Sequence, residues 1–178
     1  MNQFDLAAVR WGLVLAMCTL FMGAYLGVQF GRSEDQIKAS LKETATASAA
    51  FSGNAEKIDA AAQSGWKYLK RSHEHFQGLG AIAIGLVLLV SASWIKPGLK
   101  TAAAIRVGLG AFIYPLFWYL AACRAAEMGK HAAKESLELV AQFGAGLFSA
   151  SALFIFFTVL CFAIWKDKLP SFVFKLKA

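Results

Sequence analysis

The chain has 178 residues, of which 58% are hydrophobic, and it carries a formal net charge of +7. Because soluble domains are only about 45–50% apolar, this composition indicates an integral membrane protein. The charged residues crowd between apolar runs, so positions flanking a membrane explain the basic excess better than nucleic-acid binding does. The three cysteines, Cys18, Cys123 and Cys161, form no CxxC or CxxCH pattern, which argues against a disulfide framework, a thiolate zinc site and covalent haem.

The first apolar run, residues 11–30, contains no charged side chain and predicts the first transmembrane helix. A cleavable signal peptide would have a shorter apolar core with a small-residue cleavage site close behind it. The nearest such stretch, Ala47–Ala49, lies far downstream, so we expect this helix to be retained. Gly23, Gly27 and Gly31 recur at four-residue intervals, which predicts one helix face that packs closely against another helix.

The long polar segment that follows, residues 33–75, predicts an amphipathic helical hairpin. Ser33 and Gln36 have the spacing of a capping box, which marks a helix start. Ser52–Asn54 form a break, after which apolar residues recur at three- and four-residue intervals as far as His73. We expect this second helix to continue directly into the next transmembrane helix.

Three further apolar runs complete the predicted architecture. A short basic turn, residues 96–106, and a polar connection that we expect to be helical, residues 124–138, would join them. The predicted fold class is therefore an all-α integral membrane protein, a single domain with four transmembrane helices and the amphipathic hairpin between the first and second. The three remaining transmembrane helices are predicted at residues 76–95, 107–123 and 139–165.

Basic residues and tryptophans predict the orientation of these helices. The segments on the side of both chain ends have the higher density of Lys and Arg, which favours cytoplasmic N and C termini, as in a bacterial inner membrane. Trp11, Trp94 and Trp165 would all fall at that same interface, as an aromatic belt requires. The hairpin and all three histidines would then face the outside.

Chemistry-bearing side chains are scarce, and no residue can be given a catalytic role. The predicted transmembrane helices contain no Asp, Glu, Lys, Arg or His, which argues against a proton pump or an ion-coupled transporter. The sequence also has no Gly-rich phosphate loop, no GxSxG motif and no HExxH motif.

One constellation of histidines and glutamates flanks the second and third transmembrane helices. Because these helices are antiparallel neighbours, residues before the second and after the third would reach the same membrane face. Imidazole and carboxylate suit zinc, iron or copper, and two histidines on facing helices could hold haem b. The alternative is that these are ordinary solvated residues at helix ends, since no spacing is diagnostic. The constellation includes Glu74 and Glu127, and its candidate ligands are the histidines His73, His75 and His131 and the carboxylates Glu135 and Glu138.

The sequence leaves three functional hypotheses open. The first is a small non-catalytic subunit that packs through its glycine face into a larger membrane complex, respiratory or otherwise energy-transducing, or that self-associates in the bilayer. The second is a redox protein that binds haem or a transition metal at its outer face. The third, a small-molecule carrier or channel, is disfavoured because four apolar helices offer little polar lining.

Overall fold

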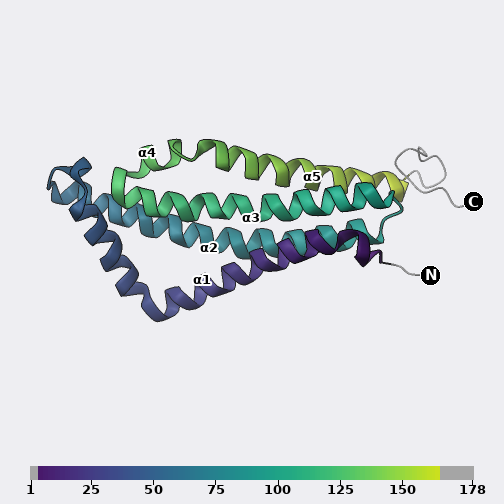
Figure 1. Ribbon diagram of the computed structural model, residues 1–178, viewed down its shortest axis with the longest axis horizontal. Helices are drawn as coiled ribbons and strands as arrows, with labels where there is room; N and C mark the ends of the chain where they lie inside the picture. Colours follow the sequence, from purple (N-terminus) through teal and green to yellow (C-terminus); the bar gives the residue numbers. More distant parts are fainter. Residues whose placement is uncertain (1–3, 165–178) are drawn as a thin grey trace, which may run out of the picture.

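The computed structural model describes residues 4–164, and within them helices joined by short turns account for the fold (Figure 1). Successive long helices run in alternating directions along the molecule. The prediction of an all-helical chain with four helices long and apolar enough to span a membrane is confirmed. The elements are α1 Leu6–Ala47, the short 3₁₀ helix η1 Ala49–Phe51, α2 Ala55–Ala92, α3 Pro97–Met128, α4 Lys130–Glu135 and α5 Glu138–Ile164.

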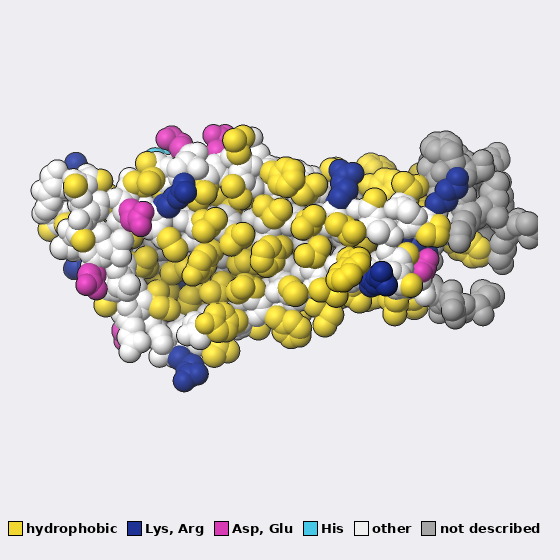
Figure 2. Space-filling view, in the orientation of Figure 1, with side chains coloured by type: hydrophobic (Ala, Val, Ile, Leu, Met, Phe, Trp, Pro, Cys, Tyr) yellow, Lys and Arg dark blue, Asp and Glu magenta, His cyan; other side chains and the backbone are white. Residues whose placement is uncertain are grey.

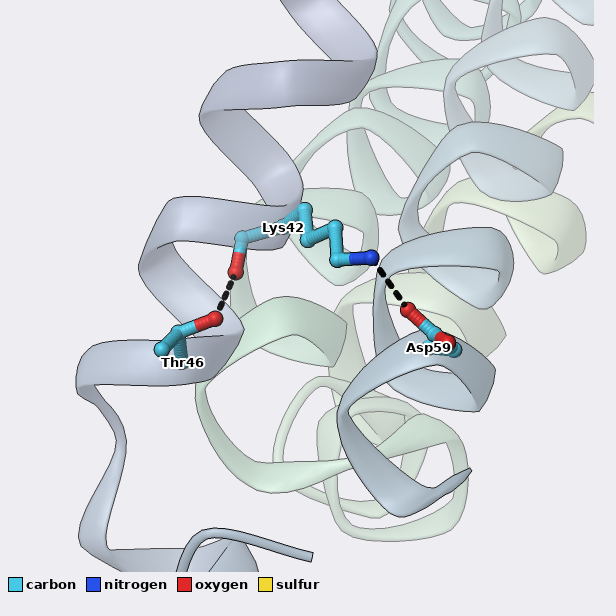
Figure 3. Close-up of polar contacts among 3 residues, drawn as sticks. All are labelled: Lys42, Thr46 and Asp59. Atoms are coloured by element: carbon cyan, nitrogen blue, oxygen red, sulfur yellow. Dashed lines mark hydrogen bonds and ion pairs between the residues drawn. The ribbon is translucent and has the colours of Figure 1, made fainter. Parts of the chain in front are cut away.

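A kink at Ser33 divides α1 into two parts that meet at an angle (Figure 1). Ser33 has a φ of -139° and a ψ of 25°, which are not helical values. The residue expected to cap a new helix therefore marks a bend, and the first apolar run and the first half of the hairpin belong to one element. Beyond the bend, Lys42 Nζ lies 2.9 Å from an Asp59 carboxylate oxygen on α2, and Thr46 donates a hydrogen bond to the Lys42 carbonyl (Figure 3).

The turn between α1 and α2 follows from its residue types. Ser52 and Gly53 both have positive φ angles, 48° and 71°, and glycine adopts this left-handed region without strain. Asn54 then caps α2, because its side-chain oxygen accepts a hydrogen bond from the Lys57 amide at 3.0 Å. α2 continues without interruption to Ala92, so the second half of the hairpin and the second apolar run form one helix.

The connection between α2 and α3 differs from the prediction. Residues 96–106 are not a turn, because α3 begins at Pro97 and includes the rest of that segment. Proline is favoured at the first helical position, where its missing N–H removes no hydrogen bond. At its other end α3 extends to Met128, and Gly129, with a φ of 85°, separates it from α4. The polar segment 124–138 is therefore largely helical, as expected from its sequence.

α3 is the central helix, since it contacts α1, α2 and α5, whereas α5 packs mainly against α3. Glycines let the backbones approach closely. A Cβ added at Gly12 would lie 2.3 Å from the Ala104 carbonyl oxygen, and one at Gly110 would lie 2.4 Å from the Phe148 nitrogen. Contacts through small residues are a main source of helix association in lipid. Buried alanines fill much of the inner face of α3, namely Ala103, Ala104, Ala111, Ala121, Ala122 and Ala125.

On the face shown in Figure 2, hydrophobic side chains cover the middle of the molecule, and charged side chains lie mainly toward its two ends. Large apolar side chains stay exposed on the outer helices, for example Phe21 at 62% and Phe143 at 61%. An exposed apolar belt of this kind marks a surface that contacts lipid or protein. We call the end of the molecule opposite Leu6 and Ile164 the cap; it comprises α1 beyond Ser33, η1, α2 up to His75, and α4.

Candidate functional site

His73 is turned toward α1 and away from the other predicted ligands. Its Nδ1 lies 2.8 Å from the Gly23 carbonyl oxygen, and because a carbonyl can only accept, Nδ1 carries a proton and donates it. The imidazole also meets Phe30 edge-on, with ring centroids 5.6 Å apart. A Cβ added at Gly27 would lie only 2.8 Å from His73 Cε1. The imidazole therefore fills a slot on α1 that exists because Gly27 has no side chain.

His75 lies on the opposite side of α2 and faces α3. Its half-buried ring meets Tyr114 edge-on at 5.1 Å and stacks on Trp118 at 6.3 Å between centroids. The guanidinium carbon of Arg71 lies 4.5 Å from the centroid of the Trp118 ring, which is a cation–π contact. Tyr68 adds a further ring at 5.2 Å from Trp118. We call these five residues the aromatic cluster.

The remaining predicted ligands, and Glu127 with them, lie on the surface in the cap or directly beside it. His131 and Glu135 belong to α4, Glu138 begins α5, Glu127 lies near the end of α3, and all four are exposed. The Glu138 carboxylate accepts a hydrogen bond from Gln142 Nε2 at 2.8 Å. Among residues 4–164, no group of three His, Cys, Asp or Glu side chains could hold a metal ion. The structure thus does not bring the predicted ligands together into one site.

The aromatic cluster is built for packing. Its contacts are between rings, or between a ring and a guanidinium, and such contacts stabilise by dispersion and by the charge distribution of the rings. Trp118 Nε1 is buried and has no hydrogen-bond partner among the described residues. An unpaired buried donor costs about 1–3 kcal/mol, so the packing gained around the indole must offset it. The cluster joins α2 to α3 directly above the apolar part of α2.

The predicted glycine face of α1 points into the molecule. A Cβ added at Gly23 would lie 2.6 Å from Gln77 Cγ and 2.7 Å from the Gln77 nitrogen on α2, and Gly27 faces the His73 ring. An added Cβ at Gly31 would meet nothing within 4 Å. Gly23 and Gly27 therefore pack against this chain's own α2, and they are not free to contact a second protein.

A different row of small residues faces outward on α2. Gly78, Ala81 and Gly85 are all exposed, and their three- and four-residue spacing places them on one helix face. A Cβ added at Gly78 or Gly85 would meet nothing within 4 Å. The bulky side chains of Ile82 and Leu89 are exposed on the same side. We call Gly78, Ala81 and Gly85 the open small-residue face.

Sequence reasoning overlooked this face, although its glycines are visible in the second apolar run. The same run contains Gly80, where an added Cβ would lie 2.7 Å from the Leu20 nitrogen on α1. Gly80, which faces inward, thus lies only two residues from Gly78, which faces outward. The sequence does not distinguish the two, because the difference depends on how α1 and α3 pack around α2.

Comparison of the chain with known protein families, with curated proteins and with solved structures found no match.

Proposed function

We propose that this chain is a small non-catalytic subunit of a larger membrane complex, and that it binds its neighbour through the open small-residue face of α2. The observation that carries the proposal is that Gly78, Ala81 and Gly85 are exposed on a helix already packed against α1 and α3. Lipid gives no net hydrophobic drive for helix association, so interfaces there rely on small residues that let backbones approach closely. A helix from another subunit, or from a second copy, fits this row better than flexible lipid chains do.

Two observations favour this role over a haem or metal centre. The imidazole of His73 is hydrogen-bonded to Gly23, and that of His75 is stacked on Trp118. Both rings are used to join helices within the molecule. Because His73 faces α1 and His75 faces α3, a single cofactor could not take both as ligands without rearranging α2.

We further propose that α1, α2, α3 and α5 cross a membrane such as the bacterial inner membrane, with the chain ends in the cytoplasm and the cap outside. The apolar belt supports the crossing (Figure 2). The density of Lys and Arg near the chain ends supports the orientation. Trp11 and Trp94 belong to the end of the molecule that holds Leu6, whereas Trp165, the third residue of the predicted belt, lies outside the described residues.

The substitution Gly85→Leu tests the proposed interface. A Cβ added at Gly85 meets nothing within 4 Å, so the variant should fold normally while holding a facing helix away. After gentle detergent extraction from native membranes, the wild-type chain should migrate on a native gel in an assembly larger than the monomer. Gly85→Leu should release the monomer.

The matched control is Ala24→Leu on α1. Ala24 is exposed among the large side chains of Phe21, Tyr25 and Val28, a surface suited to lipid, so this variant should leave the assembly intact. A monomeric wild type would refute the proposal. So would an assembly that both variants disrupt equally or that neither variant changes.

A further inference from the structure

Three lysines line a pocket in the cap. Lys57 and Lys67 come from α2 and Lys130 begins α4, and the pocket has a volume of about 350 Å³. Buried Phe51 of η1 and buried Ala61 of α2 give it an apolar floor. Because η1, α2 and α4 all contribute, the pocket is a product of the tertiary fold.

The two lysines of α2 have no acidic residue on the same face within one turn of their own helix. Lys57 and Lys67 lie on one side of α2 with Ser64 between them, and no Asp or Glu lies three or four residues from either. Asp59 is turned to the other side of α2, where it pairs with Lys42 (Figure 3). In the part of the chain that the structure describes, none of the three pocket lysines takes part in an ion pair.

We infer that this pocket binds a soluble anion that carries phosphate groups. All three lysines are exposed, and a multivalent anion in the pocket would be attracted to all three ammonium groups at once. Lysine is a compact point charge with three donors, and it is a regular ligand of phosphate oxygens. The amide of Gln63, which also lines the pocket, can donate a further hydrogen bond. Phe51 and Ala61 would contact the organic part of the ligand.

The height of the pocket favours a soluble ligand over a lipid headgroup. At a helical rise of about 1.5 Å per residue, Lys67 lies roughly 13 Å and Lys57 roughly 28 Å beyond Phe76, where the apolar run of α2 begins. The headgroup layer is only roughly 5–8 Å thick on each side of the bilayer. The pocket therefore opens to water above the headgroups, a placement that rests on the proposed membrane crossing.

Binding of pyrophosphate to the full-length chain in phosphatidylcholine nanodiscs tests this inference. Isothermal titration calorimetry at low salt should show saturable binding of one pyrophosphate per chain. Lys57→Gln and Lys67→Gln should each weaken the affinity about tenfold, the loss expected for one charge-assisted contact. The matched control is Lys70→Gln, which removes the same charge from the same helix, at a residue that lies over Trp66 on the side of α1. This control should change the affinity less than about twofold.

Three results would overturn the inference. The first is a wild-type chain that binds no pyrophosphate saturably, and the second is an equal loss of affinity in Lys70→Gln and Lys67→Gln, which would indicate non-specific attraction. The third is competition by phosphatidylglycerol in the nanodisc at constant salt, which would assign the pocket to a lipid headgroup. The assay needs no partner protein, so its failure is separate from a failure of the proposed interface on α2.

Discussion

His73 and His75 are two positions apart on α2, so about 200° of helical rotation separates their side chains. The sequence alone therefore predicts that they face different neighbours, and the structure places one against α1 and the other against α3. The sequence does not predict what each ring meets. His73 fits against Gly23 and Gly27 because these residues lack side chains, and that match between two helices depends on their relative rotation.

The slot for His73 yields a prediction at the level of one residue. Gly27→Leu should lower the free energy of unfolding by about 1–3 kcal/mol, the usual penalty of overpacking, because the new Cβ would lie 2.8 Å from the imidazole. Gly31→Leu is the matched control, since its Cβ would meet nothing within 4 Å. Its stability should be unchanged or slightly higher, because glycine is about 0.8–1.0 kcal/mol worse than alanine in a helix interior.

Thermal unfolding of both variants in the same detergent measures the difference. A Gly27→Leu chain that is as stable as Gly31→Leu would show that His73 does not occupy this slot on α1. A further variant, Gly27→Leu with His73→Ala, should recover part of the lost stability, because the clash disappears when the ring is removed.

Helix ends divide into those that the sequence predicts and those that it does not. Ser33 and Asn54 both carry a polar side chain suited to capping, and each marks a real change in the chain: a kink in α1 and the start of α2. Pro97–Gly98 is a turn signal followed by charged residues, so the sequence predicts a turn over residues 96–106. Proline is equally suited to the first position of a helix, and the alanines after it continue α3.

Lys100 shows how this early start of α3 stabilises the end of α2. The Lys100 side chain is only 7% exposed, and its Nζ donates to the Ser91 carbonyl in the last turn of α2 at 2.6 Å. Carbonyls at a helix C-terminus lack partners within the helix and carry partial negative charge. They therefore stabilise a buried ammonium group that lies next to them. The Asp5 amide donates to the same carbonyl at 3.2 Å. One acceptor thus joins the ends of three helices.

We predict that Lys100→Met lowers the free energy of unfolding by about 1.5–3 kcal/mol, the range for a hydrogen bond to a charged group. Lys96→Met is the control, because the Lys96 side chain is exposed and should contribute little. Chemical unfolding in detergent distinguishes the two. If Lys100→Met is instead more stable than the wild type, the desolvation of the ammonium outweighs its contacts, and this account of the helix end is wrong.

For the whole molecule, the sequence predicts the number of long apolar helices because a helix able to span the roughly 30 Å of a bilayer's hydrocarbon needs about 20 apolar residues in a row, and such runs are visible in the sequence. No comparable length rule governs which side of a helix meets which neighbour. The spacing of the α1 glycines therefore predicts a close helix contact without identifying the partner, and the structure shows that Gly23 and Gly27 pack against α2. Connectivity alone predicts that the histidine and glutamate constellation lies on one face of the membrane. The rotation of α2 turns His73 toward α1 and His75 toward α3.

The open small-residue face and the lysine pocket are both properties of the assembled molecule. Gly78 and Gly85 are distinguished from Gly80 only by the positions of α1 and α3 around α2. The pocket likewise forms only where η1 and α4 meet the first part of α2. If the chain crosses the bilayer as proposed, the first lies within the hydrocarbon and the second in water, so each can be altered without changing the other.

Both proposals depend on four membrane crossings that put the cap and the chain ends on opposite sides, and thiol labelling in intact cells tests this most directly. In a background in which Cys18, Cys123 and Cys161 are replaced by serine, Ala50→Cys places a thiol on the exposed surface of η1 in the cap. Gly98→Cys places one at the opposite end, where an added Cβ meets nothing within 4 Å. A membrane-impermeant maleimide should label Ala50→Cys from outside, and should label Gly98→Cys only after the membrane is permeabilised. Labelling of both positions from the same side would contradict the account.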